Sequence, residues 1–327
     1  MRVLITGAGG FIGSHLVEDQ LSQGNHVTAV DLNTKQLETL AFDDRLKIIQ
    51  IDFVDPEFVK KELKGHEICF HLASAHLETG VGDDYFWKVN VADTLEFVRF
   101  CHEAGIERFI HCSTVGVYGD IQNPPADEES ECHPNVPYEL SKLAGENAVR
   151  EYAVNERYAL VVLRPAWVYG PRCSRTEKLF RMIKKGRFFF VGDGSTLRHP
   201  IYISDMVKGF ELASKFSGTP GEIFIIAGAK PTTLQELANK IADALNVQNP
   251  KIRLPKSLVW VGVTVLELFA GLTGIKVPFT RRSLKFYTGN TAFSIAKAQA
   301  MLDFQPQVGL DAGIKRTLNW LVEENRI

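Results

Sequence analysis

Apolar and polar positions follow two kinds of pattern along the first two thirds of the chain, one typical of strands and one typical of helices. Short runs rich in Val, Ile and Leu predict buried β-strands, and apolar residues at helical spacing predict helices between them. The predicted strands are Arg2–Thr6, His26–Asp31, Leu46–Ile51, Ile68–Leu72, Phe109–Ser113, Ala159–Arg164 and Glu222–Ala227. The predicted helices are Ser14–Gln23, Pro56–Leu63, Tyr85–Ala104 and Tyr138–Asn155. Because strands and helices alternate, we expect an α/β fold with a doubly wound parallel sheet of about seven strands.

The rest of the chain is less regular and predicts a smaller, mostly helical domain. Prolines and acidic residues mark Asn123–Pro137 as a solvated loop rather than a helix. Later helical patterns include the basic stretch Lys178–Lys185 and the stretch Gly309–Glu324 near the end of the chain. We expect a sheet domain formed by residues 1–165 and 201–228, and a helical domain formed by residues 166–200 and 229–327.

Composition narrows the class of protein. Of 327 residues, 45% are hydrophobic and 23% are charged, which is typical of a globular domain. The net charge of -2 disfavours nucleic-acid binding, which usually requires a basic surplus. Five cysteines without a CxxC pair predict reduced thiols and no zinc site. Because the first strand begins at Arg2, a cleaved signal peptide has no room, and we expect a cytoplasmic protein.

Glycines follow the first predicted strand. Gly7 permits a tight turn, Gly10 lets the backbone approach a pyrophosphate, and Gly13 allows the next helix to pack closely on the strand. The phosphates would lie at the positive end of that helix. Since a strand precedes these glycines and an amphipathic helix follows, we predict a Rossmann dinucleotide site in which Gly7, Gly10, Phe11, Ile12 and Gly13 contact the cofactor.

Acidic residues follow the second and third strands. Asp31 can accept hydrogen bonds from the adenosine ribose and would repel a 2′-phosphate, and the two residues after it supply no cation. We therefore expect NAD rather than NADP. Asp52 can accept from the adenine amino group, with capping of a helix as its alternative role. We assign Asp52 and the adjacent Phe53 to the cofactor site.

A candidate acid/base begins the helix predicted at 138–155. Tyr138 and Lys142 are one turn apart on the same helix face. A lysine beside a tyrosine lowers the pKa of the phenol, because the cation favours the phenolate. Thr114 follows the fifth strand at the carboxyl end of the sheet, where doubly wound folds bind ligands. We predict that Thr114 bonds the substrate oxygen while Tyr138 exchanges its proton.

Several segments together resemble the extended short-chain dehydrogenase/reductase family, which includes NAD-dependent sugar epimerases and dehydratases and 3β-hydroxysteroid dehydrogenase-like enzymes. They are TGAGGFIG at 6–13, HLAS at 71–74, NVADT at 90–94, STVGVYG at 113–119, YELSK at 138–142, LRPAWVYGP at 163–171 and HPIYISDMV at 199–207. The resemblance covers nearly the whole chain. It implies hydride transfer between nicotinamide and a secondary alcohol or ketone carbon.

The resemblance also implies roles for single residues. Tyr138 matches the catalytic acid/base, Lys142 its partner and a ribose ligand, and Thr114 the third catalytic residue. Asn90 matches a residue that orders the site. Four further residues match positions that line the cofactor: Leu72, Ala73, Ser74 and Pro165.

Substrate signals point in two directions. Trp167 stands where sugar-nucleotide enzymes of the family usually carry Asn, and an indole cannot replace an amide as acceptor and double donor. Arg198 matches an arginine that clamps nucleotide phosphates, and Arg281 and Arg282 are further phosphate candidates. We assign Trp167 and Arg198 to the substrate site, with a surface or interdomain role as the alternative for Arg198.

Apolar segments favour a hydrophobic substrate. Phe188–Phe190 is an aromatic run, and residues 255–306 resemble the C-terminal part of sterol dehydrogenase-like relatives. The segment Leu258–Ile275 has Glu267 as its only charge and approaches the length of a membrane span. We interpret this segment as a helix that is buried or covers the substrate. A peripheral membrane contact is the alternative.

Three functions follow from these observations. The first hypothesis is an NAD-dependent oxidoreductase acting on the secondary alcohol or ketone of a sterol-like or aromatic small molecule. The second is a nucleotide-sugar 4-epimerase or dehydratase. The third is a non-catalytic scaffold that senses NAD. By resemblance, helices 85–104 and 138–155 predict a homodimer. His71 and His76 lack acidic partners at suitable spacing, so we interpret them as structural and expect no metal site.

Overall fold

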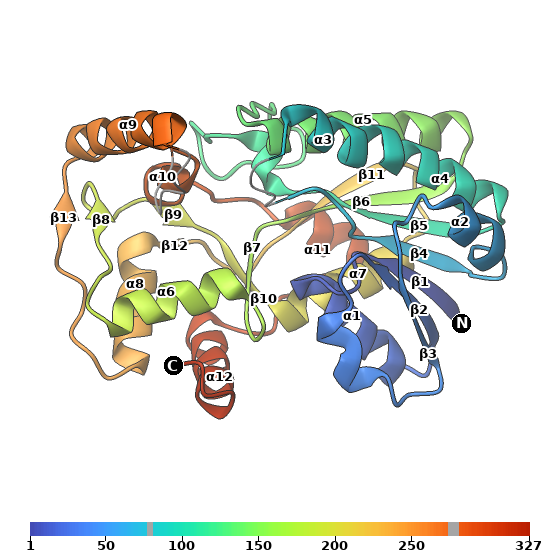
Figure 1. Ribbon diagram of the computed structural model, residues 1–327, viewed down its shortest axis with the longest axis horizontal. Helices are drawn as coiled ribbons and strands as arrows, with labels where there is room; N and C mark the ends of the chain where they lie inside the picture. Colours follow the sequence, from blue (N-terminus) through green and yellow to red (C-terminus); the bar gives the residue numbers. More distant parts are fainter. Residues whose placement is uncertain (77–80, 274–280) are drawn as a thin grey trace.

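A seven-stranded parallel sheet forms the centre of the computed structural model, which describes residues 1–76, 81–273 and 281–327 (Figure 1). The strands are β1 (Arg2–Thr6), β2 (His26–Asp31), β3 (Leu46–Gln50), β4 (Ile68–His71), β5 (Arg108–Cys112), β6 (Ala159–Pro165) and β11 (Glu222–Ile226). Their order across the sheet is β11-β6-β5-β4-β1-β2-β3, and every neighbouring pair is parallel. This is the doubly wound Rossmann arrangement that the alternation of strands and helices predicts.

Helices cover both faces of this sheet (Figure 1). One face carries α1 (Phe11–Ser22) and α7 (Ile203–Ser214), and α11 (Ala296–Leu302) packs beside β11. The other carries α2 (Pro56–Glu62), α3 (Asp83–Trp87), α4 (Thr94–Glu103) and α5 (Pro137–Asn155). Each face has its own hydrophobic core, because the central strands are apolar on both sides.

One predicted helix differs from the structure. The stretch predicted as a single helix at 85–104 consists of α3, a π-helical turn η2 (Lys88–Asp93) and α4. A π-turn widens the helix locally, and such turns are frequent at functional sites. Asn90 lies in this turn and is buried. Two short 3-10 helices complete this half of the chain, η1 (Lys35–Leu40) and η3 (Val115–Tyr118).

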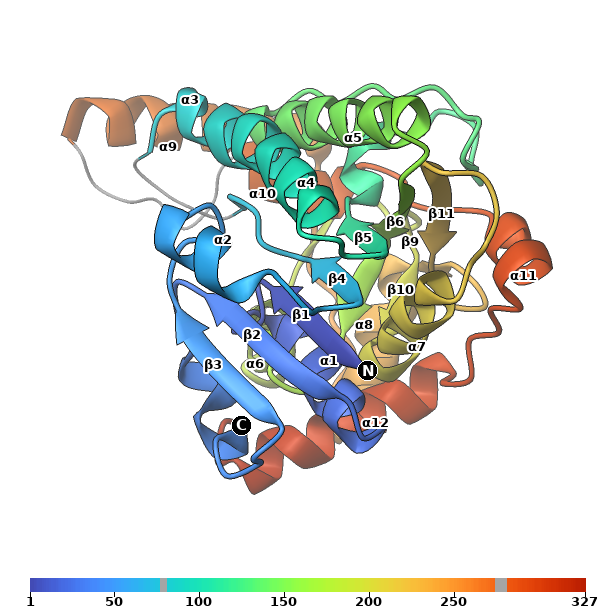
Figure 2. The ribbon, with the colours of Figure 1, turned by 90° about the vertical axis from the view of Figure 1, so that its right-hand side faces the viewer.

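A second lobe lies beyond the carboxyl ends of the strands (Figures 1 and 2). Its helices are α6 (Ser174–Lys184), α8 (Leu234–Ala244), α9 (Lys256–Thr273), α10 (Arg281–Thr288) and α12 (Leu310–Glu323). Its short strands pair as β7 (Trp167–Tyr169) with β10 (Pro200–Tyr202), β9 (Leu197–Arg198) with β12 (Thr232–Thr233), and β8 (Phe190–Val191) with β13 (Arg253–Leu254). A third core holds this lobe together.

The described side chains of the apolar segment at 258–275 contradict a fully buried helix, which is one of its two expected forms. It is helical in α9 as far as Thr273, but large side chains such as Leu258 and Val261 are exposed rather than buried. Residues 274 and 275 lie outside the described part of the chain. Among the described residues, we find no helix with the length and apolar character needed to cross a membrane.

Candidate active site

A cleft of about 570 Å³ opens where β1 and β4 end beside each other. The chain leaves these two strands toward opposite sides of the sheet, so their carboxyl ends diverge and form a crevice. Residues of the second lobe, among them Trp167, Cys173 and Arg175, form its other wall. Both the sheet and the smaller lobe therefore contribute residues to this cleft.

The glycine turn between β1 and α1 fits a dinucleotide. Gly7 has a positive φ of 69°, and a Cβ there would lie 2.5 Å from the Ala73 nitrogen. A Cβ on Gly13 would lie 2.1 Å from the Gly7 oxygen, so only glycine lets α1 pack on the turn. Gly10 caps α1 without a side-chain hydrogen bond, which leaves the first amides of the helix for a phosphate. Gly7, Gly10, Phe11, Ile12 and Gly13 all line the cleft.

Both predicted carboxylates line the same cleft. Asp31 accepts hydrogen bonds from the amides of Gly9 and Asn33, each at 2.9 Å, which fixes the carboxylate at the end of β2. Asp52 accepts from the Val54 amide at 3.3 Å, whereas Asp55 caps helix α2. The alternative capping role of Asp52 is therefore wrong.

The remaining predicted cofactor contacts surround these groups. Phe53, Leu72, Ala73, Ser74 and Pro165 all line the cleft. Phe53 is buried against His71, with ring centroids 4.9 Å apart, so it forms part of the floor. The arrangement offers apolar walls with carboxylates at one end, as an adenosine with ribose hydroxyls requires.

Tyr138 and Thr114 face the other end of the cleft. The Thr114 hydroxyl accepts a hydrogen bond from the Gly116 amide at 3.0 Å, which fixes the turn after β5. Lys142 is buried beneath the cleft and donates to the Cys112 carbonyl at 2.8 Å. Burial lowers the pKa of Lys142, and the nearby Cys112 and Glu146 partly oppose that shift. The three predicted catalytic residues thus meet where β5 and α5 meet.

Asn90 connects the elements that carry this site. Its amide nitrogen donates to the Ala75 carbonyl and to the Ser141 hydroxyl, both at 3.0 Å. Its amide oxygen accepts from the Ala75 amide at 2.9 Å. Asn90 therefore joins the segment after β4 to α5 without lining the cleft itself, which matches an ordering role.

A buried ion pair supports the catalytic helix from behind. Arg164 on β6 donates to Glu146 on α5, with one contact at 2.5 Å, and both side chains are buried. Ser113 donates to the same carboxylate at 2.6 Å, and Arg164 also donates to the Tyr118 hydroxyl at 2.5 Å. All partners are hydrogen bonded, as a buried charge pair requires.

The two predicted substrate residues have different positions. Trp167 lines the cleft and stacks on Tyr169, with ring centroids 6.0 Å apart. Arg198 is buried outside the lining of the cleft, and its guanidinium donates to the carbonyls of Leu197 and Gly289. In this structure Arg198 therefore forms hydrogen bonds inside the lobe and does not line the cleft. The side chains of Arg281 and Arg282 lie outside the described part.

The cleft also contains residues that the sequence did not indicate. His76 and Tyr138 lie ring to ring, with centroids 4.5 Å apart, and Arg175 contacts His76. The structural interpretation of His71 agrees with its burial, whereas His76 lines the cleft. His76 follows the HLAS segment directly, which was a usable signal. Arg175 is 99 residues away along the chain, and no spacing rule joins the two.

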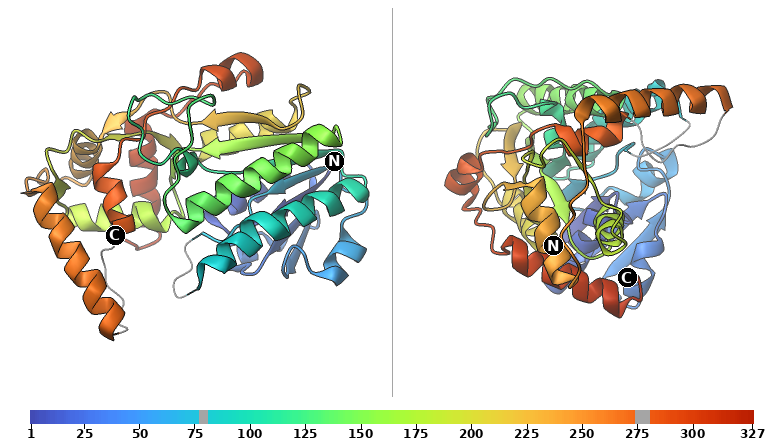
Figure 3. Two further views of the ribbon diagram at one scale, coloured as in Figure 1. Left: turned by 90° about the horizontal axis from the view of Figure 1, so that it is seen from above. Right: turned by 90° about the vertical axis from the view of Figure 1, so that its left-hand side faces the viewer.

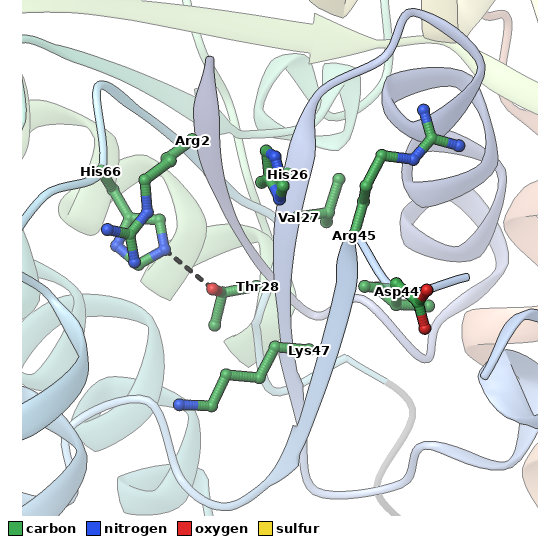
Figure 4. A pocket seen from close by; sticks show the side chains of 9 residues that line it. Arg2, His26, Val27, Thr28, Asp44, Arg45, Lys47 and His66 are labelled. Atoms are coloured by element: carbon green, nitrogen blue, oxygen red, sulfur yellow. Dashed lines mark hydrogen bonds between the residues drawn. The ribbon is translucent and has the colours of Figure 1, made fainter. Parts of the chain in front are cut away.

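A second hollow lies at the opposite ends of β1 to β3 (Figure 4). Cationic side chains line it, but Lys47 is paired with Glu62, and Arg45 with Asp43. The Arg45 side chain points away from the hollow (Figure 4). Two of the three lysine and arginine side chains that line this hollow are thus paired with carboxylates.

Comparisons with known proteins agree with the geometry. The model of a family described as the NAD dependent epimerase/dehydratase family matches residues 3–227. Human dTDP-D-glucose 4,6-dehydratase is 28% identical over 98% of this chain and 90% of that protein. UDP-glucose 4-epimerase of Mycolicibacterium smegmatis is 29% identical over 98% of both chains. The crystal structure of UDP-glucuronic acid 4-epimerase from Bacillus cereus in complex with NAD has a TM-score of 0.80, with 25% identity and 99% of both chains covered.

Proposed function

Because the chain belongs to the NAD-dependent epimerase/dehydratase family, we propose that it is a 4-epimerase of a nucleotide sugar. The expected family and fold are confirmed, and the cofactor is NAD. Similar proteins carry names of nucleotide-sugar enzymes, which favours the second hypothesis over a sterol-like or aromatic substrate. The proposal selects epimerisation over dehydration on the chemistry of the cleft.

The choice of epimerisation over dehydration rests on the positions of the carboxylates in the cleft. Within the described residues, Asp31 and Asp52 are the only acidic side chains that line the cleft, and both lie at the ends of β2 and β3. A 4,6-dehydration must also remove a C5 proton and protonate the leaving C6 hydroxyl, which calls for additional acid and base groups. In the turn after Thr114, Val115 and Gly116 supply neither. His76, which lies against Tyr138, would then have to serve a dehydration as its acid or base. Epimerisation at C4 needs only one acid/base, and Tyr138 fills that role.

Tyr138, Thr114 and Lys142 have separate roles in the proposed reaction. The glycine turn and Asp31 would hold NAD, which would supply the hydride acceptor and donor for the sugar C4. Tyr138 takes the proton of the C4 hydroxyl during oxidation and returns it to the oxygen during reduction. Thr114 holds the same oxygen, and the buried Lys142 supplies a positive charge that favours the phenolate. The product is the C4 epimer, with no net change in cofactor redox state.

The test is turnover of nucleotide sugars. Purified protein is incubated with UDP-glucose, UDP-N-acetylglucosamine, UDP-glucuronate and dTDP-glucose, and the products are separated by chromatography and identified by NMR. We expect one substrate to form its C4 epimer without accumulation of free NADH. A 4-keto-6-deoxy sugar would instead show a dehydratase and would refute the choice made from the carboxylates.

A dehydrogenase for a hydrophobic alcohol is the second candidate. Trp167 favours it, since its ring lines the cleft and contacts Phe286 at a centroid distance of 5.9 Å. Sterol and aromatic alcohols are therefore assayed beside the nucleotide sugars. Stoichiometric NADH release from such an alcohol would support this candidate. Tyr138→Phe tests the scaffold hypothesis, because a scaffold would keep its cellular function while an enzyme would lose it.

A further inference from the structure

Helix α9 presents large apolar side chains to solvent. They are Leu258 (62% exposed), Trp260 (49%), Val261 (63%) and Leu266 (40%). Leu258, Val261 and Leu266 are three and five residues apart, which places them on one side of an α-helix. Val263, which faces away from Leu258 and Val261, is buried. Helix α9 is therefore apolar both where it packs on the lobe and where it meets solvent.

A neighbouring helix shows the usual pattern. The exposed positions of α6 are all polar, namely Ser174, Arg175, Lys178, Arg181 and Lys184. Its apolar residues, such as Leu179 and Phe180, are buried. Helix α9 also projects from the rest of the molecule (Figures 2 and 3). The exposed apolar side of α9 is thus a distinct surface and not a general property of the lobe.

Positive charges border this apolar side. Lys251, Arg253 and Lys256 are exposed in the segment that leads into α9. Arg253 donates to the Asp193 carbonyl and to the Gln235 amide oxygen, which are neutral acceptors. The Asp193 carboxylate is the acid that interacts with Lys256. Glu267 on α9 is a second acid, so the three cations exceed the acids by one positive charge.

We propose that α9 and residues 251–256 lie on the surface of an anionic lipid bilayer. A helix with large apolar side chains such as Leu258 and Val261 on its lipid-facing side and Lys or Arg at its border is the type that lies in the plane of the interface. The positive excess matches anionic headgroups, whereas a second copy of this chain would bring like charges together.

This position brings the site close to the lipid. Helix α9 packs against α10, and Phe286 of α10 contacts Trp167 in the lining of the cleft. The substrate end of the cleft therefore lies one helix away from the bilayer surface. The proposal depends on the exposed surface alone and not on which substrate the enzyme uses.

Vesicle co-sedimentation tests the proposal. The full-length protein is mixed with vesicles of phosphatidylcholine, with or without phosphatidylglycerol, at low and high salt. We expect binding to the anionic vesicles, weakened by salt and reduced about tenfold or more in the variant L258S/V261S/L266S. K251Q/K256Q should lose the preference for phosphatidylglycerol. Val322→Ser on α12 removes an equally exposed apolar side chain (56%) and should bind like wild type.

Two further measurements keep the test decisive if the triple variant folds poorly. Vesicles should shift the tryptophan fluorescence of the variant Val261→Trp to shorter wavelength more than that of wild type, because residue 261 is on the exposed apolar side. Analytical ultracentrifugation without lipid gives the mass of wild type and triple variant. Wild-type protein that stays in the supernatant with both vesicle types, or self-association that the triple variant removes, would overturn the proposal.

Discussion

Single side chains of the cleft allow separate tests of the cofactor and of the proposed substrate. Asp31 is held by two backbone amides at the end of β2, so its carboxylate cannot turn away from an adenosine ribose. We expect Asp31→Ser to weaken NAD binding about tenfold, since it removes a charge-assisted hydrogen bond, and to strengthen NADP binding. Isothermal titration with both cofactors measures this. Asp44→Ser, at the opposite end of the sheet, is the control, and an unchanged preference for NAD would contradict the prediction.

Arg175 is the cation that the second lobe contributes to the cleft near Tyr138. A nucleotide sugar carries a diphosphate, and an arginine bonds phosphate oxygens more strongly than a neutral group does. We expect Arg175→Ala to raise the KM for the nucleotide sugar about tenfold and to change kcat little. Steady-state kinetics measure both constants. Lys178→Ala, exposed on the same helix, is the control, and an equal KM in the two variants would remove Arg175 from the substrate site.

The buried side chain of His111, beneath the site, destabilises the folded state. Neither of its ring nitrogens has a hydrogen-bond partner among the described residues, and the side chain is buried. Burial lowers its pKa well below the ordinary value of 6.5, and the nearby Lys142 adds to the shift. As the pH falls below 6.5, the unfolded chain takes up a proton here while the folded chain does not, so the folded state loses stability.

His111→Leu should therefore stabilise the protein. We expect the free energy of unfolding to rise by about 1–3 kcal/mol at neutral pH, because two buried polar atoms without partners are removed. The gain should grow as the pH falls from 6.5. Urea denaturation at several pH values measures it, and His133→Leu at the surface is the control. A gain that is constant with pH would contradict the argument from protonation.

At the scale of elements, the buried pair of Glu146 and Arg164 fixes α5 against β6. Glu146→Gln removes the negative charge and leaves the guanidinium buried without a counter-ion. We expect the free energy of unfolding to fall by about 3 kcal/mol. Chemical denaturation measures the loss. Glu151→Gln, exposed on the same helix, should have little effect, and a loss of similar size there would refute the assignment.

Local patterns predicted the elements well, because strands and helices bury residues with different periods. The seven strand positions agree with the structure to within one residue at each end. The π-turn around Asn90 could not be predicted, since it depends on how Asn90 bonds to Ala75 and Ser141. Likewise, the match of Arg198 to a phosphate ligand could not show that one of its guanidinium nitrogens donates to the carbonyls of Leu197 and Gly289. Contacts between distant segments decide such details.

At the scale of the whole molecule, we predict a homodimer formed through the helices on one face of the sheet. Helices α3, α4 and α5 lie together on that face (Figure 1), and Trp87, Leu140 and Val154 expose apolar surface along them or at their ends. In the dimer, α4 and α5 of one protomer would pack against α4 and α5 of its partner. This four-helix interface would bury these side chains.

Val154→Arg places a charge in the proposed interface, where it would lie without a partner and favour separate protomers. We expect analytical ultracentrifugation to give twice the chain mass for wild type and the single chain mass for this variant. L258S/V261S/L266S should remain dimeric, because its substitutions are on α9, which lies in the other lobe and apart from α4 and α5 (Figure 3). A wild-type protein that sediments with the mass of one chain at micromolar concentration would contradict the dimer. If the α9 variant alone lost the dimer, the interface would instead lie on α9, and the membrane surface would have to be abandoned as its partner.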